Sequence, residues 1–300
     1  MFERVELEIT HRCNLNCIHC YLPYLQKTRN EGLNELTTNE IYLLIDQISL
    51  IGIPEIHFTG GEPLMRKDII ELMRYSHKKG LKTILETNGT LIDEEMARRI
   101  KDSGVFCVKV SLDGLYQTFE KIRGKNMYEK VINGIVKLKN IGQSIEVDVA
   151  ISQLNKNQIN EIIDIAHKLS VNYLKIRLVL PIDEDEKYNN LLLSPQDILK
   201  IHNKVQEKKK QYKNLIIHDD LLLNESIERL VTKSFTIDPY GYVRPYPFSD
   251  IEVGNIRHIE LNKILERLPS SLSKVKMKSR RIQEYFDRIQ NYLSNVKIQV

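Results

Sequence analysis

The sequence lacks several features that would indicate a nucleic-acid-binding, membrane or secreted protein. Its 44 Lys and Arg residues are nearly balanced by 40 Asp and Glu residues, and a net charge of +4 is too small to predict a nucleic-acid partner. The longest apolar stretches, such as residues 41–50, are much shorter than the roughly 20 residues that a membrane-spanning helix needs. The first residues run into a strand pattern without the apolar core of a signal peptide. We therefore expect a cytoplasmic protein that binds neither nucleic acid nor membranes.

Cysteine is also scarce, and its distribution is uneven. Three of the four cysteines, Cys13, Cys17 and Cys20, lie close together, and the fourth is Cys107. Cysteines spaced in this way make a poor disulfide framework for a chain of 300 residues. The three clustered cysteines are instead typical of metal ligands.

Between residue 5 and about residue 180, short β-rich segments alternate with amphipathic helical segments, which is typical of parallel βα units. The predicted strands are residues 5–10, 55–59, 82–87, 106–112, 146–152 and 173–180. Thr37 and Glu40 form a capping-box pattern before one helix, Asp93 stands at the start of another, and Gly80 follows the end of a third. Six such units predict an α/β fold, a partial (β/α)6 barrel with its functional groups at the C-terminal ends of the strands.

The alternation ends at Pro181, so we predict a barrel core in residues 1–181 and a small α+β extension in residues 182–300. Within the extension, Asp238-Pro239-Tyr240-Gly241 is a turn signal. It predicts a β-hairpin between residues 235–237 and 242–246.

Helices are expected on both sides of this hairpin. An acidic segment, residues 183–186, precedes a long polar helix that begins at Ser194-Pro195 and ends near Tyr212. Residues 273–293 are predicted to be a basic amphipathic helix that covers the barrel.

Cys13, Cys17 and Cys20 follow the first predicted strand directly. Their spacing, C-x3-C-x2-C, lets a single loop place three thiolates around one corner of a metal cluster. Zinc is the alternative, but a closed zinc site needs four protein ligands, so His11 or His19 would have to supply the fourth. Three cysteines on an iron–sulfur cluster leave one iron open to a small molecule.

The cysteine loop resembles the signature of radical S-adenosylmethionine enzymes, and four further segments match that family in the right order. They are Gly60-Gly61-Glu62-Pro63, Glu86-Thr87-Asn88-Gly89, Ser111-Leu112-Asp113-Gly114 and Arg123-Gly124. The resemblance implies one [4Fe-4S] cluster on the three cysteines, with its open iron chelated by the amino and carboxylate groups of S-adenosylmethionine. It also implies reductive cleavage of that cofactor to methionine and a 5′-deoxyadenosyl radical, which takes a hydrogen atom from the substrate. The electron would come from a flavodoxin or a ferredoxin.

By the same resemblance, Gly60, Gly61, Glu62 and Pro63 form the site for the amino group of the methionine moiety. Two glycines let the backbone approach a ligand closely, and the Glu62 carboxylate can accept a hydrogen bond from a positively charged amine. Without the cysteines, this segment would be read as a plain turn.

Further contacts to the cofactor are implied at the ends of the next two strands and beyond them. Asn88, Ser111 and Asp113 are expected to bind its ribose or carboxylate, because ligand sites collect at the C-terminal ends of parallel strands. Taken singly, each could equally be part of an Asx-type turn. Arg123 is expected to pair with the methionine carboxylate, with an exposed arginine as the alternative, and His19 to stack on the adenine.

The extension resembles the start of the SPASM or twitch extension of peptide-modifying relatives. The resemblance lies in residues 235–256, in Gly241-Tyr242-Val243-Arg244-Pro245-Tyr246-Pro247 and the following Val253-Gly254-Asn255-Ile256. Those relatives have a cysteine where this chain has Tyr246 and several more after it, whereas this chain has none after Cys107. We therefore expect no auxiliary cluster, and we expect the hairpin around Tyr246 to be a lid or a substrate-docking surface.

Cys107 has two interpretations. It shares strand parity with Lys109 and Ser111, so we expect all three to face the barrel interior. A thiol there can donate a hydrogen atom to a substrate radical. The alternative, a small buried hydrophobic residue, is favoured because buried free cysteines are common.

For the substrate, the resemblance of the extension favours modification of a ribosomally made peptide or protein. The second candidate is a small metabolite such as a sugar, a nucleoside or a tetrapyrrole. A zinc-stabilised binding module without catalysis is the remote alternative, and it predicts a colourless protein.

Overall fold

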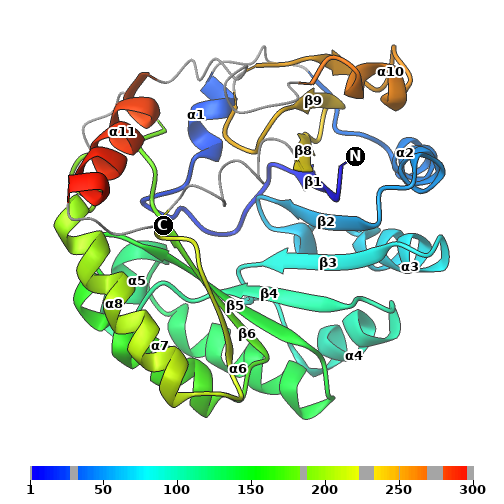
Figure 1. The fold of residues 1–300 in the computed structure, drawn as a ribbon. Helices are drawn as coiled ribbons and strands as arrows, with labels where there is room; N and C mark the ends of the chain where they lie inside the picture. Colours follow the sequence, from blue (N-terminus) through cyan, green and yellow to red (C-terminus); the bar gives the residue numbers. More distant parts are fainter. Residues whose placement is uncertain are drawn as a thin grey trace.

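The computed structural model describes residues 2–27, 33–182, 188–222, 233–249, 251–268 and 280–295. Its centre is a curved, mostly parallel sheet with helices on the outer side (Figure 1). The sheet has ten strands in the order β10-β9-β8-β1-β2-β3-β4-β5-β6-β7. Because this order has two ends, the barrel is open, and the predicted α/β partial barrel is confirmed.

Six parallel strands form the core of the sheet. They are β1 (Arg4–Thr10), β2 (Glu55–Gly60), β3 (Lys82–Thr87), β4 (Cys107–Ser111), β5 (Ile145–Ile151) and β6 (Tyr173–Leu178). Each matches a strand that the sequence predicts, with ends that differ by two residues at most. In β1 the apolar residues Val5, Leu7 and Ile9 belong to the hydrophobic core, and Glu6 and Glu8 alternate with them toward the inner face.

Six helices follow these strands, and three of them begin or end at signals that the sequence predicts. They are α2 (Thr38–Ile51), α3 (Ile69–Lys78), α4 (Glu94–Asp102), α5 (Tyr116–Arg123), α6 (Tyr128–Asn140) and α7 (Ile159–Lys168). Thr37 and Glu40 form the predicted capping box at the start of α2, and the Asp93 side chain accepts a hydrogen bond from the Met96 N–H at the start of α4. Gly80, with φ +81°, follows α3 as expected.

The strands beyond residue 181 continue the same sheet at both of its edges. Next to β6, β7 (Ile216–Asp219) adds a parallel strand. Next to β1, β8 (Ser234–Ile237) pairs in parallel, and β9 (Tyr242–Arg244) and β10 (Gly254–Asn255) follow antiparallel. The predicted hairpin is therefore present, but the sequence did not reveal its attachment to β1. The predicted boundary at residue 181 lies between two parts of one continuous sheet.

Helices of the extension, together with α1 (Leu22–Lys27) after the cysteine loop, complete the described chain. They are α8 (Pro195–Gln211), α10 (Leu261–Leu265) and α11 (Arg280–Asn295). The Ser194 side chain caps α8 as predicted, by accepting a hydrogen bond from the Asp197 N–H. The acidic segment 183–186 and the first part of the predicted helix 273–293 lie outside the described residues.

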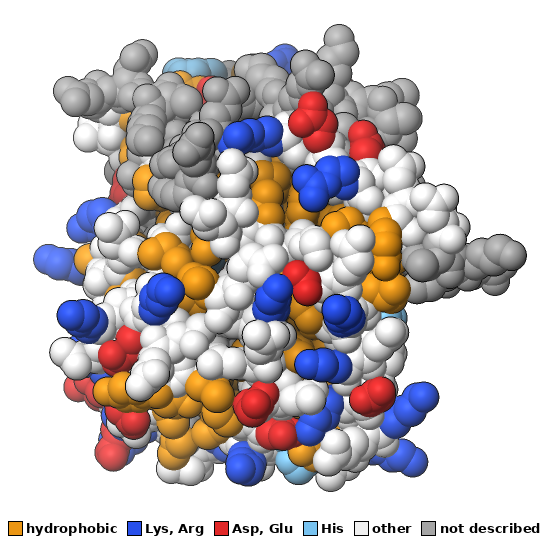
Figure 2. All heavy atoms as spheres, turned by 90° about the vertical axis from the view of Figure 1, so that its left-hand side faces the viewer, with side chains coloured by type: hydrophobic (Ala, Val, Ile, Leu, Met, Phe, Trp, Pro, Cys, Tyr) orange, Lys and Arg blue, Asp and Glu red, His pale blue; other side chains and the backbone are white. Residues whose placement is uncertain are grey.

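The outer surface near α8 and α11 carries charges of both signs. Figure 2 shows this side of the molecule, with Lys and Arg side chains interspersed among Asp, Glu and hydrophobic side chains. Among the helices that the structure describes, none is both long enough and apolar enough to cross a membrane.

Candidate active site

Cys13, Cys17 and Cys20 lie on the loop between β1 and α1, at the C-terminal ends of the core strands. All three cysteines are free, and they share one short loop. Three thiolates on one loop can bind three irons of an iron–sulfur cluster, whereas a closed zinc site needs a fourth protein ligand.

Hydrogen-bond donors lie beside the sulfur atoms of Cys13 and Cys17. The Leu15 N–H lies 3.4 Å from Cys13 Sγ, Asn88 Nδ2 lies 3.9 Å from the same sulfur, and Arg123 Nη1 lies 3.9 Å from Cys17 Sγ. Burial raises the pKa of all three loop thiols, that of Cys17 to about 11, although Arg123 opposes this effect. Thiolates in this setting need the positive charge of bound metal, so the donor set suits a cluster.

Gly60 and Gly61 bring the end of β2 against the backbone that leads to Cys13. The Gly61 N–H donates to Thr10 O at 2.8 Å, and the Glu62 N–H donates to Arg12 O at 2.8 Å. A Cβ atom would lie 2.4 Å from Thr10 O at Gly60, where φ is +120°, and 2.2 Å from Arg12 O at Gly61. The pair of glycines is therefore required by this close approach of two chain segments. The resemblance implied cofactor contact for both glycines, whereas this second role has no local signal in the sequence.

Glu62 is fully buried at the start of a short 3-10 turn, Pro63–Met65. Its carboxylate accepts hydrogen bonds from the Leu64 N–H (3.0 Å), the Thr87 hydroxyl (2.7 Å) and the Asn88 N–H (2.8 Å). Burial raises the pKa of Glu62, and these hydrogen bonds oppose the rise. The carboxylate is thus fixed at the end of β3, beside Asn88.

Asn88 links the end of β3 to the cysteine loop. Its Nδ2 donates to Asn14 Oδ1 at 2.9 Å, and its Oδ1 accepts from the Thr90 N–H at 2.9 Å. The turn is therefore of the Asx type, which the sequence analysis considered as the alternative, and the same side chain also lies beside Cys13.

On the other side of the loop, the partly buried Arg123 and His19 lie around the fully buried carboxylate of Asp113. Arg123 Nε donates to Asp113 Oδ2 at 2.5 Å, the Ala150 N–H donates to Asp113 Oδ1 at 2.7 Å, and His19 Nε2 lies 3.5 Å from Asp113 Oδ2. Burial lowers the pKa of His19 to about 4, against the attraction of Asp113, so the ring is neutral at neutral pH. Ser111 is partly buried at the end of β4.

Cys107 lies at the opposite end of β4 from Ser111, away from the cysteine loop. The residue is 4% exposed, its sulfur lies 3.9 Å from Val108 O, and burial raises its pKa to about 11. This placement favours the interpretation as a small buried hydrophobic residue. Tyr246 is also buried, with its ring 4.8 Å from that of Phe248, and the role of its hairpin as a lid or docking surface stays a prediction.

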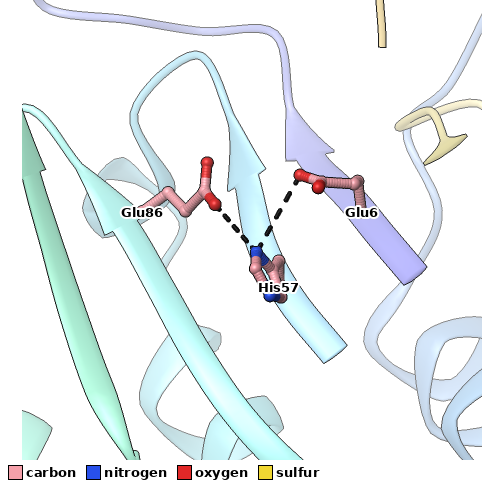
Figure 3. Close-up of side chains that lie close together, drawn as sticks. All are labelled: Glu6, His57 and Glu86. Carbon is pink, nitrogen blue, oxygen red and sulfur yellow. Dashed lines mark hydrogen bonds and ion pairs between the residues drawn. The ribbon is translucent and has the colours of Figure 1, made fainter. Parts of the chain in front are cut away.

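The inner face of the barrel carries a charged cluster that the sequence analysis missed. Figure 3 shows Glu6 from β1, His57 from β2 and Glu86 from β3 pointing toward one another. His57 Nδ1 lies 2.8 Å from Glu86 Oε1 and 4.0 Å from Glu6 Oε2, and its Nε2 lies 2.5 Å from Glu55 Oε1. Strand parity could have placed these residues on one face, since each points inward from its strand.

The carboxylates of this cluster have cationic partners. Lys109 Nζ lies 3.1 Å from Glu86, and Arg4 Nε lies 3.1 Å from Glu6. Lys82 Nζ lies 2.8 Å from Glu55. Burial alone would raise the pKa of Glu55, but the hydrogen bond to the His57 imidazole and the charge of Lys82 lower this pKa to about 2. These lysine and arginine side chains balance the negative charges of Glu6, Glu55 and Glu86, so the cluster is a network of ion pairs.

Further around the inner face, Arg177 of β6 pairs with Asp148 of β5. The Arg177 side chain is 48% exposed, whereas Asp148 is 5% exposed. Lys175, on the same face of β6, pairs with Asp220 at 3.1 Å. The inner wall of the barrel is therefore polar and charged from β1 to β6.

A family model described as the radical SAM superfamily matches residues 7–169. Among curated proteins, the chain is 42% identical over 158 residues to an Fe-coproporphyrin III synthase of Methanosarcina barkeri, covering 52% of this chain and 39% of that protein. It is 31% identical over 208 residues to an AdoMet-dependent heme synthase of the same organism, covering 69% and 58%. It is 31% identical over 204 residues to a GTP 3′,8-cyclase of Clostridium botulinum, covering 66% and 63%. The chain thus spans about half the length of the curated relatives it matches.

Two solved structures resemble the fold over nearly the whole chain. SuiB of Streptococcus suis bound to S-adenosylmethionine has a TM-score of 0.73 at 16% identity, covering 95% of this chain and 68% of that one. The protein anSMEcpe with bound AdoMet and the Kp18Cys peptide has a TM-score of 0.74 at 18% identity, covering 98% and 97%. At this level of identity the likeness is one of fold.

Proposed function

The chain belongs to the radical SAM superfamily of enzymes, and from this premise we propose that Cys13, Cys17 and Cys20 hold one [4Fe-4S] cluster that binds S-adenosylmethionine. The observation that carries the proposal is the placement of three free cysteines on one loop at the C-terminal ends of the strands, with donors facing their sulfur atoms. When bound and reduced, the cluster supplies the electron that cleaves the cofactor to methionine and a 5′-deoxyadenosyl radical able to take hydrogen from a substrate.

The residues around the loop would orient the cofactor. Glu62, fixed by three hydrogen bonds, offers a carboxylate to the amino group. Asn88 and Arg123 lie beside cluster cysteines, where they can meet the ribose and the methionine carboxylate, and Asp113 holds the arginine in place. His19, neutral because it is buried, presents a flat ring to the adenine.

For the substrate we propose a small metabolite that carries carboxylate or phosphate groups. The curated relatives with 31–42% identity are named for a porphyrin, for heme and for GTP, which are all small molecules with acidic groups. The charged inner wall supports this choice, because Arg177 presents a half-exposed guanidinium there. A guanidinium binds carboxylates and phosphates in a bidentate manner.

A ribosomally made peptide is the second candidate. The observation in its favour is the hairpin of β8 and β9, whose sequence around Arg244 and Tyr246 resembles the extension of peptide-modifying enzymes. The solved structures with bound peptides support only the fold, so this candidate ranks below the small metabolite.

The test is a turnover assay with reconstituted, reduced protein under anaerobic conditions. We expect brown protein that forms 5′-deoxyadenosine from S-adenosylmethionine, with a flavodoxin or a ferredoxin as the proposed electron donor. Deuterated porphyrin carboxylates, nucleoside triphosphates and peptides would then be compared, and deuterium in 5′-deoxyadenosine would identify the substrate class. A colourless protein with stoichiometric zinc and no iron would refute the enzyme, and label transfer only from peptides would refute the small-metabolite proposal.

A further inference from the structure

The cysteine loop is held from the C-terminal half of the chain by two buried side chains, Arg244 and Tyr188. We propose that these are positioning residues for the cluster, so that the extension secures the cluster-binding loop although it contributes no cysteine. The inference rests on the proposed cluster at Cys13, Cys17 and Cys20.

Glu8 is the point at which the two ends of the cysteine loop meet. This residue of β1 is fully buried. His11 Nε2 lies 3.0 Å from Glu8 Oε2, and the Tyr21 hydroxyl donates to Glu8 Oε1 at 3.0 Å. His11 stands shortly before Cys13, and Tyr21 follows Cys20 directly. A single carboxylate therefore ties the start of the loop to its end.

Arg244 supplies the positive charge for this carboxylate. Its Nη2 forms an ion pair with Glu8 Oε2, and both side chains are 0% exposed. Its Nη1 donates to Pro247 O at 2.7 Å and lies 3.4 Å from Ser249 O, so the turn after β9 fixes the guanidinium. Separating two buried charges leaves each one uncompensated, which keeps such a pair together once it has formed.

The sheet explains how Arg244 reaches the loop. In β8, Thr236 lies opposite Glu6 of β1 on one side and opposite Arg244 of β9 on the other. The antiparallel β9 thus holds Arg244 one strand beyond β8, from where its long side chain reaches Glu8 of β1. Strand pairing fixes the position of Arg244 relative to Glu8. An extension that packed on the barrel without strand pairing would not fix it.

Tyr188 acts on the loop directly. It lies between β6 and α8, it is 1% exposed, and it packs against Val179 and Leu191. Its hydroxyl donates to the backbone oxygen of Cys20 at 2.7 Å. The bond fixes the backbone from which one of the three cluster thiolates extends. Residues that orient metal ligands through hydrogen bonds affect both metal retention and the electronic properties of the metal.

Tyr188→Phe tests the proposal, and Tyr285→Phe is the matched control. Tyr285 is also a buried tyrosine whose hydroxyl donates to a backbone oxygen, that of Leu193 at 3.1 Å, which lies outside the cysteine loop. Both variants would be reconstituted with iron and sulfide and compared with the wild type. The measurements are thermal unfolding, the rate at which a chelator removes iron, and the electron paramagnetic resonance spectrum of the reduced cluster.

We expect Tyr188→Phe to lose iron roughly tenfold faster than the wild type and to show a changed spectrum. The control should lose similar thermal stability while its iron release and its spectrum stay those of the wild type. Arg244→Lys keeps the charge but not the planar fork of donors, so it should behave as Tyr188→Phe does. Should Arg244→Lys fail to fold, Tyr21→Phe removes one hydroxyl from Glu8 and gives the same test.

The positioning role would be overturned if Tyr188→Phe released iron at the rate of the Tyr285→Phe control and gave the same spectrum. The same result would have to hold for Arg244→Lys or, in its place, Tyr21→Phe. Wild-type protein that still cleaves S-adenosylmethionine would show that the proposed function survives this failure. Wild-type protein that takes up no iron at all would overturn both.

Discussion

Replacing Glu62 by glutamine removes a buried negative charge and leaves the size of the side chain almost unchanged. In the wild type, one carboxylate oxygen accepts hydrogen bonds from the Leu64 N–H and the Thr87 hydroxyl, and the other accepts one from the Asn88 N–H. The glutamine amide has a single oxygen. Its NH2 group must therefore face either the Asn88 N–H or the Leu64 N–H and Thr87 hydroxyl, all of which are donors. A buried donor left without an acceptor costs about 1–3 kcal/mol, and we expect Glu62→Gln to lose that much stability.

Cofactor binding adds a second effect that can be separated from the first. If the carboxylate holds the amino group of S-adenosylmethionine, loss of the charge should weaken binding by about 1.5–3 kcal/mol, or roughly 10- to 150-fold in Kd. Calorimetric titration of reconstituted protein measures this effect, and urea unfolding measures the stability. Thr87→Val is the control, because it removes one hydrogen bond to Glu62 and keeps the charge. Equal cofactor affinity in Glu62→Gln and Thr87→Val would refute the proposed contact.

The remaining predictions concern the metal content and the pH dependence of stability. Alanine at Cys13, Cys17 or Cys20 should abolish iron binding and cofactor cleavage, whereas Cys107→Ala should keep the iron content of the wild type; equal loss in all four variants, by iron assay, would contradict this. Reconstitution with excess iron and sulfide should give about four irons per chain, because a second cluster needs roughly three or four further thiolates; eight irons would contradict it. Although burial opposes it, the hydrogen bond to His57 and the Lys82 charge lower the pKa of Glu55 to about 2, below its unfolded value. Glu55 therefore stabilises the iron-free protein above about pH 4.5, by on the order of 1 kcal/mol after solvent screening, and this contribution is lost as the pH falls toward 2. The stability difference between wild type and Glu55→Gln in urea unfolding should therefore shrink below pH 4.5, and a constant difference would contradict the assignment.

The core strands and helix ends could be predicted from the sequence because their signals are local. In β1, apolar and acidic residues alternate over a few positions, and this alternation alone defines a strand with one face toward the helices. The capping box of Thr37 and Glu40 involves two residues three positions apart, so the start of α2 follows directly from the sequence. The three cysteines of the candidate site were found for the same reason, since they share one short loop.

Contacts between distant segments left no comparable signal. Glu8 and Arg244 are 236 positions apart, and neither residue type nor spacing indicates that β8 pairs with β1 and brings them together. The role of Gly61 beside Arg12 O was hidden for the same reason, because it depends on how two loops approach each other. Strand parity predicted that Lys109 faces the interior. Its partners Glu86 and Glu146 lie on the two neighbouring strands, and they can be identified only when the register of the sheet is known.

The pairing of Arg177 with Asp148 links the charged inner wall to the proposed substrate class. Burial raises the pKa of Asp148 more than the guanidinium lowers it, and its Oδ1 has no hydrogen-bond partner among the residues that the structure describes. This carboxylate is therefore an unfavourable place for a negative charge, although Arg177 itself is half exposed and remains charged. An acidic group of a substrate that reaches Arg177 can take over the ion pair, and Asp148 can then bind a proton. A neutral substrate offers no such exchange, so this pair supports the proposal of a substrate with carboxylate or phosphate groups.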